Sequence, residues 1–179
     1  MSKYLVVVDM QKDFIDGSLG TPEAQAVVPK VIEKIKNFPG TVVYTRDTHD
    51  EDYLDTLEGK KLPVVHCVVG TKGWEFQDDI QKLITENRSL VFDKNTFGST
   101  QLVGCIRGID RMAAIDEVIL VGLCTDICVL ANAILVRTGM PNTLVTVDAS
   151  CCAGSTPEKH RNALEAMKSC QIDIEGASI

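Results

Sequence analysis

The sequence lacks any hydrophobic run long enough to cross a membrane and any cluster of basic residues. A membrane-spanning helix needs about 20 consecutive apolar residues. Contact with nucleic acid or anionic lipid needs grouped lysines and arginines. Acidic residues are instead in excess, at 25 Asp and Glu against 18 Lys and Arg, which gives a net charge of −7. The composition therefore argues against nucleic acid and membrane as partners.

A secretory signal and a disulfide framework are missing as well. The first four residues lead directly into an apolar run at 5–8, and the seven cysteines are an odd number without short framework spacing. These features indicate a reducing compartment, so we expect a cytoplasmic protein. With 179 residues, 45% of them hydrophobic, the chain is long enough for one well-buried core. We expect residues 1–179 to form a single domain.

Short apolar runs alternate with helix-like segments along the chain. Strands are predicted at 5–8, 41–45, 89–92, 118–121, 143–148 and 171–174, and helices at 22–38, 78–86, 101–108, after residue 128 and from 157. This order is typical of βαβ units. We predict an α/β fold, a doubly wound and mostly parallel six-stranded sheet with helices on both faces. The irregular stretch at 49–74 exceeds ordinary loop lengths, which favours a functional loop.

Cys128 follows one of these apolar runs. The run at 118–121 ends at Gly122, and apolar residues recur at helical spacing after Cys128, so the cysteine is predicted to lie in a strand-to-helix turn. Unpaired N–H groups and the helix dipole would ease ionisation of a thiol there and stabilise a nearby oxyanion. The alternative is a buried cysteine that acts as a small hydrophobe.

Two charged residues end other predicted strands. Asp9 follows the run at 5–8, and Lys94 follows the run at 90–93. Ligands bind outside the carboxyl ends of the strands in open parallel sheets, so Asp9, Lys94 and Cys128 are expected to converge there. Taken separately, Asp9 could be a turn or capping residue and Lys94 a solvated loop residue. Taken together, the three side chains favour a catalytic site.

Three segments resemble, in order and spacing, the motifs of the isochorismatase-like cysteine hydrolases. They are Val-Val-Asp-Met-Gln-Lys-Asp-Phe at 7–14, Asp-Lys-Asn-Thr-Phe-Gly-Ser at 93–99 and Gly-Leu-Cys-Thr-Asp-Ile-Cys-Val at 122–129. This superfamily includes nicotinamidases, N-carbamoylsarcosine amidases, ureido-acid hydrolases and isochorismatases. By position, the resemblance assigns Asp9, Lys94 and Cys128 to the catalytic triad.

A second constellation suggests a metal site. Asp47, His49 and His66 offer a carboxylate and two imidazoles, which suit a borderline divalent ion and leave coordination positions open. The pattern resembles the nicotinamidase metal site, in which some members supply a further carboxylate at the position of Glu58. The resemblance implies one divalent ion, zinc first, with iron or manganese as alternatives. Otherwise the two histidines cap turns or bind carbonyl groups.

The substrate pocket is predicted less sharply. Phe14 and Phe97 match aromatic or bulky pocket positions of the family. Leu62 stands where nicotinamidases often carry an aromatic residue that packs on the pyridine ring, and this departure weighs against a nicotinamide substrate. Trp74 follows the metal segment and is interpreted first as an ordinary core or surface aromatic.

The resemblance also implies a mechanism. Asp9 takes the thiol proton, Lys94 lowers the pKa of Cys128, and the thiolate attacks an amide carbonyl to form a thioester. The backbone N–H groups of Cys124 and Cys128 would hold the oxyanion, with the Leu123–Cys124 peptide bond in the cis form.

We therefore expect a cysteine amidohydrolase that releases ammonia from a small carboxamide, first of all nicotinamide. An isochorismatase-type or a ureido or N-carbamoyl hydrolase, and a non-catalytic binding module on the same fold, are the alternatives. Intact Asp9, Lys94 and Cys128 argue against the binding module. A homo-oligomer is also expected.

Overall fold

The computed structural model describes residues 2–177, so the ends of the predicted domain, Met1 and residues 178–179, lie outside the described residues. At its centre is a sheet in the order β3-β2-β1-β4-β5-β6, in which every pair of neighbouring strands is parallel. The strands are β1 (Lys3–Val8), β2 (Thr41–Asp47), β3 (Val91–Lys94), β4 (Glu117–Leu123), β5 (Leu144–Ala153) and β6 (Asp173–Glu175). The predicted six-stranded α/β fold is confirmed.

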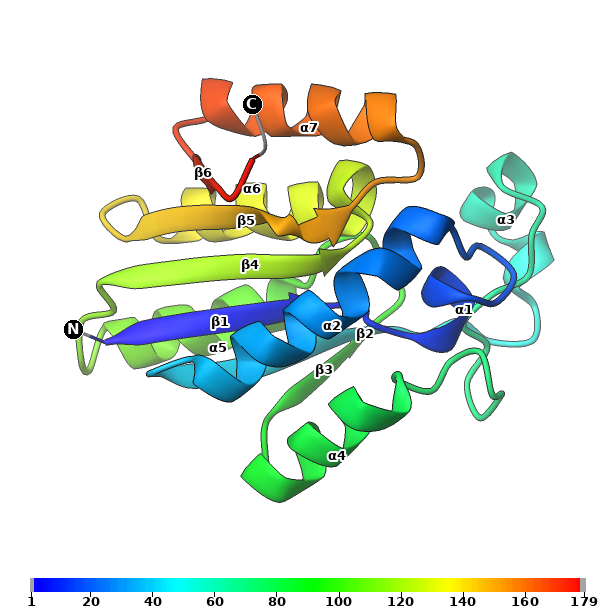
Figure 1. The fold of residues 1–179 in the computed structure, drawn as a ribbon, viewed down its shortest axis with the longest axis horizontal. Coiled ribbons are helices and arrows are strands. Elements are labelled where there is room, and N and C mark those ends of the chain that lie inside the picture. Colours follow the sequence, from blue (N-terminus) through cyan, green and yellow to red (C-terminus); the bar gives the residue numbers. More distant parts are fainter. Residues whose placement is uncertain (1, 178–179) are drawn as a thin grey trace.

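Helices cover both faces of the sheet (Figure 1). They are α1 (Lys12–Ile15), α2 (Pro22–Asn37), α3 (Leu57–Lys61), α4 (Asp78–Asn87), α5 (Thr100–Asp110), α6 (Leu130–Gly139) and α7 (Pro157–Ser169), with a 3-10 turn η1 (Tyr53–Asp55) and a π-helical turn η2 (Thr125–Val129). One core cluster joins α2 and α4 to the sheet, and the other joins α5, α6 and α7 to the opposite face. None of the helices described in residues 2–177 is long and apolar enough to cross a membrane.

Strand β1 is buried on both faces, which explains its uninterrupted apolar run. Leu5 and Val7 belong to the core cluster beneath α2 and α4, whereas Val6 and Val8 belong to the cluster on the other face. Successive side chains of a strand point to opposite faces, so both layers need an apolar residue at every second position.

The predicted helix starts at residues 22 and 157 are confirmed. The hydroxyls of Thr21 and Thr156 accept hydrogen bonds from Ala24 N and Lys159 N, and a proline follows each cap. The short helices α1, η1 and α3 were not predicted, because three to five residues carry too little periodicity to reveal a helix.

Strand β5 is longer than predicted. Its pairing with β4 shifts register between Leu120 and Gly122, after which Cys152 and Ala153 pair with Gly122 and Leu123. A local irregularity of this kind lets the strand continue past residue 148, where the apolar pattern alone suggested an end.

The neighbouring strands β3, β2, β1 and β4 end at the same edge of the sheet, where the chemically important residues lie. Asp47 at the end of β2 pairs with Lys94 at the end of β3, and Asp9 follows β1 directly. Gly122 allows β4 to lie close to β1 there. Its φ is +117°, and a Cβ on it would lie 2.1 Å from the carbonyl oxygen of Val8.

Candidate active site and metal centre

Asp9, Lys94 and Cys128 come together at the carboxyl edge of the sheet. Lys94 Nζ lies 2.7 Å from Asp9 Oδ2 and 3.6 Å from Cys128 Sγ. All three side chains are buried, and Asp9 is completely shielded from solvent. The amino group of Lys94 thus contacts both the carboxylate of Asp9 and the thiol of Cys128. The geometry places a fixed positive charge beside a thiol.

The Asp9 carboxylate is oriented by Thr45 on the neighbouring strand. Asp9 has a φ of +47°, a left-handed conformation that is rare outside glycine and is often found at functional sites. Its backbone N–H donates to Thr45 O at 3.2 Å, and Thr45 Oγ1 donates to Asp9 Oδ1 at 2.7 Å. Because Thr45 occupies Oδ1, the other oxygen faces Lys94.

Cys128 lies in the predicted strand-to-helix turn, but this turn has π-helical geometry. It spans Thr125–Val129 and continues directly into α6. Single π-helical turns are frequent at functional sites. The Leu123–Cys124 peptide bond is cis, as the family resemblance implied.

Burial controls the ionisation of the cysteine. Burial and the Asp9 carboxylate raise the pKa of Cys128 well above its ordinary value, and Lys94 offsets them only in part. Lys94 does lower the pKa of Cys128, as expected, but the net shift of the thiol is upward. The charged thiolate loses the water that would solvate it, and this loss outweighs the attraction of one lysine.

The pKa values of Asp9 and Lys94 are raised as well. Burial raises the pKa of Asp9, against the opposing effect of Lys94. Burial by itself would lower the pKa of Lys94, but the carboxylates of Asp9 and Asp47 outweigh burial and raise it, so the lysine stays charged. A neutral thiol thus lies in the same cluster as a carboxylate that accepts a proton more readily than an exposed aspartate would.

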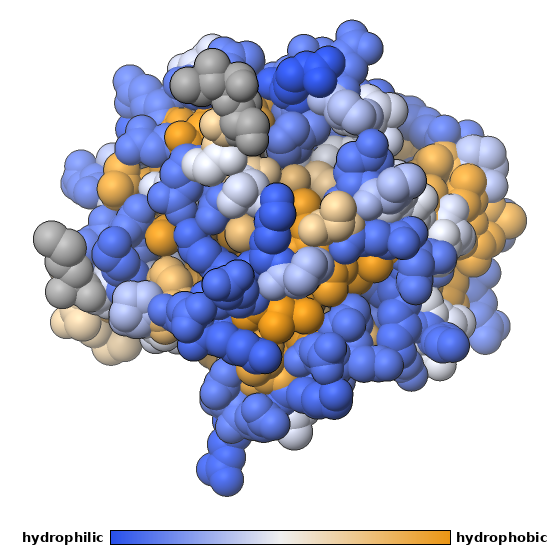
Figure 2. Space-filling model, viewed as in Figure 1, coloured by the Kyte–Doolittle hydropathy of each residue, from blue (hydrophilic) through white to orange (hydrophobic). Residues whose placement is uncertain are grey.

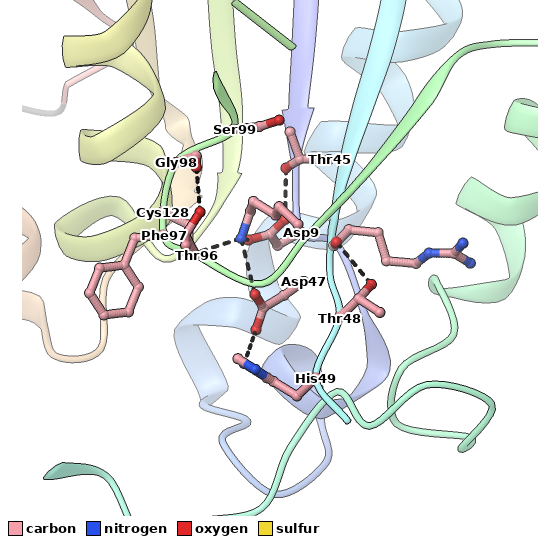
Figure 3. A network of polar contacts seen from close by, with 12 residues as sticks. Asp9, Thr45, Asp47, Thr48, His49, Thr96, Phe97, Gly98, Ser99 and Cys128 are labelled. Atoms are coloured by element: carbon pink, nitrogen blue, oxygen red, sulfur yellow. Dashed lines mark hydrogen bonds and ion pairs between the residues drawn. The ribbon is translucent and has the colours of Figure 1, made fainter. Parts of the chain in front are cut away.

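Asp47, His49 and His66 gather next to this triad. Asp47 Oδ2 lies 3.0 Å from His49 Nε2 and 3.5 Å from His66 Nε2. One potential ligand atom from each residue lies within 4.8 Å of the others, and all three residues are buried. Asp47 Oδ1 also lies 3.2 Å from Lys94 Nζ, so the two clusters share the lysine (Figure 3).

The chemistry of these residues fits a divalent cation. His66 Nδ1 donates a hydrogen bond to the carbonyl oxygen of Val64 at 2.8 Å. This tautomer leaves the lone pair on Nε2, opposite the Asp47 carboxylate. Buried His49 Nε2 makes no hydrogen bond of acceptable geometry within the described residues. The expected alternative, a histidine bound to a carbonyl group, thus applies to one nitrogen of His66 only.

Glu58 approaches the cluster from α3 without joining it. Glu58 Oε1 lies 3.9 Å from His49 Nε2, and its side chain is more exposed than those of the three ligands. Tyr53, which no sequence pattern singled out, is almost completely buried. Its ring centroid lies 4.7 Å from that of His49 and 4.9 Å from that of His66, and its hydroxyl donates to Leu62 O at 2.9 Å.

The three predicted pocket residues lie in different environments. Phe14 is buried with its ring centroid 5.5 Å from that of His66, whereas Leu62 is half-buried at the end of α3. The side chain of Phe97 is 49% exposed, and Figure 3 shows its ring projecting away from Asp9 and Asp47.

Trp74 has a structural role. Its indole Nε1 donates to Thr48 Oγ1 at 2.9 Å, and the guanidinium carbon of Arg46 lies 3.6 Å from its ring centroid. The interpretation of Trp74 as an ordinary core or surface aromatic is therefore supported.

Two further polar residues from the first motif hold the segments of Asp47 and His66 in place. Gln11 is fully buried; its Nε2 donates to Asp47 O at 2.8 Å and its Oε1 accepts from Asp47 N at 2.7 Å. Asp13 Oδ2 accepts from Cys67 N at 2.8 Å, next to His66. The clustering of polar side chains directly after a buried strand was the only sequence signal for them.

Comparison with known proteins agrees with this geometry. The sequence model of the isochorismatase domain family matches residues 3–177 of this chain. The nicotinamidase/pyrazinamidase of Mycobacterium tuberculosis is 29% identical over 187 residues, which cover 95% of this chain and 96% of that protein. The chain belongs to the isochorismatase family.

Two solved structures are similar over nearly the whole chain. The pyrazinamidase of Pyrococcus horikoshii, solved in complex with zinc, shows a TM-score of 0.78 and 30% identity, covering 97% of this chain and 98% of that one. The nicotinamidase/pyrazinamidase of Bacillus subtilis shows a TM-score of 0.80 and 26% identity, covering 98% and 100%.

Proposed function

We propose that the protein is a cysteine amidohydrolase that converts nicotinamide to nicotinate and ammonia. The observation that carries this proposal is the position of Lys94, whose amino group contacts Asp9, Cys128 and Asp47 together. A nucleophile and a set of metal ligands are thereby joined in one buried site. Relatives that share the family and most of the chain length are nicotinamidases and pyrazinamidases.

The reaction follows from the roles of the triad. Cys128 Sγ gives its proton to Asp9 and forms a bond to the amide carbon, while the carbonyl electrons move to the oxygen. The backbone N–H groups of Cys124 and Cys128 would stabilise this oxyanion, and Lys94 would stabilise the negative charge of the thiolate. Collapse then breaks the C–N bond, and Asp9 returns its proton to the nitrogen, which leaves as ammonia.

The second half of the reaction regenerates the cysteine. Asp9 takes a proton from water, and the hydroxide attacks the carbon of the Cys128 thioester. The C–S bond breaks, nicotinate forms and Cys128 recovers its proton. Asp9 serves as base and then as acid in both halves, which suits a carboxyl group whose pKa is raised by burial.

Asp47, His49 and His66 would hold the metal ion, with Glu58 as a ligand directly or through water. Zinc is the ion we propose, since it suits imidazole and carboxylate ligands. When bound, the ion supplies an open coordination position for the ring nitrogen of the substrate or for water. That contact would orient the carboxamide toward Cys128.

The pocket is proposed to accept a small flat ring. Cys128 is only 6% exposed, which favours a small acyl group. Phe14 and Phe97 would contact the ring. Leu62 would stand in place of the aromatic residue that packs on the pyridine ring in many nicotinamidases. Losing that aromatic residue should weaken stacking by about 0.5–1.5 kcal/mol, so we expect a raised KM that Leu62→Trp improves.

Ammonia release from purified, metal-loaded protein tests the proposal. Nicotinamide and pyrazinamide should be hydrolysed, and N-carbamoyl and ureido compounds should not. If only the carbamoyl or ureido compounds react, the same triad serves a sister amidase. If only isochorismate is cleaved, the proposed role of the metal ligands is wrong. No turnover of any of these compounds by metal-loaded protein would support a binding module.

We propose further that residues 1–179 act as one domain in a cytoplasmic homo-oligomer. One sheet drawn from residues 3–175 supports the single domain. Leu57 is 72% exposed, and Figure 2 shows apolar side chains at the edge of the molecule where α3 lies, which supports association. Light scattering after gel filtration tests the oligomeric state.

A further inference from the structure

Asn132 is a fully buried polar residue on α6 to which the proposed mechanism assigns no role. Its Oδ1 accepts from Ser99 N at 2.9 Å, and its Nδ2 donates to Cys128 O at 2.8 Å and to Phe97 O at 3.3 Å. The side-chain amide therefore connects the segment that carries the nucleophile to the loop that follows Lys94.

The same loop packs closely on α6 at a second point. A Cβ added to Gly98 would lie 2.5 Å from Leu135 Cδ1 and 3.2 Å from the carbonyl carbon of Ala131. Residues 95–99 thus lie against the helix through both Gly98 and Asn132. Within the loop, Thr96 Oγ1 donates to Gly98 O at 2.8 Å, so the loop is also braced internally (Figure 3).

Lys94 does not depend on this attachment. Its register is set by strand pairing with Asp47, and its carbonyl oxygen accepts from Thr48 N at 2.7 Å. Loss of the Asn132 hydrogen bonds would therefore displace residues 96–99 while leaving Lys94 in its strand. The part of the site that moves is the segment around Phe97, whose carbonyl oxygen and that of Cys128 both accept from the Asn132 amide.

We propose that Asn132 is a positioning residue that fixes the Phe97 loop against the Cys128 turn and so limits access to Cys128. This inference rests on the proposed function, because it takes Phe97 as a residue that contacts the substrate. A buried amide with three partners is suited to the task, since each lost hydrogen bond leaves a backbone group unsatisfied.

Steady-state kinetics of Asn132→Ala and Asn132→Asp with nicotinamide test the role. Asn132→Asp keeps an acceptor for Ser99 N but loses the donor to Phe97 O and Cys128 O. Both variants should raise KM by about fivefold to tenfold and lower kcat by less than about threefold. If Asn132→Ala does not fold, Asn132→Ser replaces it, because serine supplies one hydroxyl as a polar group at this position.

Val136→Ala is the matched control, since Val136 is fully buried one turn further along α6. It should lower the melting temperature without raising KM. An equal rise of KM in Val136→Ala and Asn132→Ala, or an unchanged KM in both Asn132 variants, would overturn the positioning role.

Alkylation of Cys128 separates this inference from the proposed function, because it needs no turnover. The rates with iodoacetamide and with the bulkier N-phenylmaleimide are compared by peptide mass spectrometry. In Asn132→Ala the ratio of the N-phenylmaleimide rate to the iodoacetamide rate should rise several-fold over the wild-type ratio. This result is expected even if wild-type protein does not hydrolyse nicotinamide. An unchanged ratio of the two rates would show that the loop does not limit access.

Discussion

At the scale of single residues, Lys94 decides how the two halves of the site work together. It is a buried cation between the carboxylates of Asp9 and Asp47, and it also contacts the thiol of Cys128. One lysine does not offset burial and two carboxylates, so the pKa of Cys128 lies above its ordinary value. This direction fits a mechanism in which Asp9 takes the thiol proton as the sulfur attacks.

The identity of the reactive thiol can be tested directly. Cys128→Ala should abolish turnover, because no other thiol contacts Lys94 within the described residues. Cys124→Ala should keep a substantial fraction of the activity, since Cys124 is proposed to act through its backbone N–H only. Equal labelling of both cysteines by iodoacetamide at neutral pH, with an inactive Cys124→Ala, would contradict this assignment.

Removal of one metal ligand should be visible without an activity assay. We expect His66→Ala to lower zinc affinity by about 100-fold or more. Loss of a group that only hydrogen-bonds to a ligand costs about tenfold to hundredfold, and loss of the ligand itself should cost more. Glu58→Gln should have a smaller effect, since Glu58 lies outside the three-residue group.

Elemental analysis and zinc titration monitored by calorimetry measure these affinities. Stoichiometric zinc in His66→Ala, or wild-type protein that binds none of zinc, iron and manganese, would contradict the metal site. Circular dichroism of both variants controls for folding.

At the scale of elements, the contact between β1 and β4 places the cysteine turn beside Asp9. We expect Gly122→Ala to destabilise the protein by about 3 kcal/mol or more, since the added Cβ meets a carbonyl oxygen and the positive φ disfavours alanine. Gly104→Ala is the control. Gly104 lies inside α5 with open space around it, so alanine there should stabilise by about 0.5–1 kcal/mol.

Urea unfolding curves give both differences in the free energy of unfolding. Similar stability of Gly122→Ala and wild type would show that the two strands can separate without cost. In that case the close approach of β1 and β4 would not explain the glycine.

At the scale of the whole molecule, one ion-pair cluster connects α2 to the far strands of the sheet. Lys34 Nζ lies 2.8 Å from Asp148 Oδ2 on β5 and 2.8 Å from Glu175 Oε1 on β6. Burial would raise the pKa of Asp148, but hydrogen bonds from Lys34 and Ser150 outweigh it and hold the pKa below its usual value. The contribution of Asp148 to stability is therefore complete above the unfolded pKa and is lost as the pH falls through the lower, folded pKa.

Asp148→Asn should accordingly destabilise the protein by about 1 kcal/mol at neutral pH, with the difference from wild type shrinking below about pH 4. Thermal unfolding of both proteins at a series of pH values measures this difference in stability. Lys82→Met, which breaks an exposed pair with Asp79, should change stability little at any pH. A difference for Asp148→Asn that stays constant down to acidic pH would rule out this linkage.

Local patterns were sufficient to predict the elements and most of the site. Strand runs and capped helix starts are properties of neighbouring residues, so the sheet could be anticipated from them. The strand-end pattern together with the family resemblance predicted the triad and the set of Asp47, His49 and His66. The short helices between residues 12 and 61 could not be anticipated, because so few residues show no periodicity.

The sequence by itself determined the residue types, their order and the strands after which Asp9, Asp47, Lys94 and Cys128 were expected. Only the tertiary structure decided that one lysine serves both clusters and that the pKa of Cys128 is raised rather than lowered. It also decided that Asn132 connects two segments distant in the chain. Burial and long-range hydrogen bonds depend on which elements pack together, and this information is absent from any short stretch of sequence.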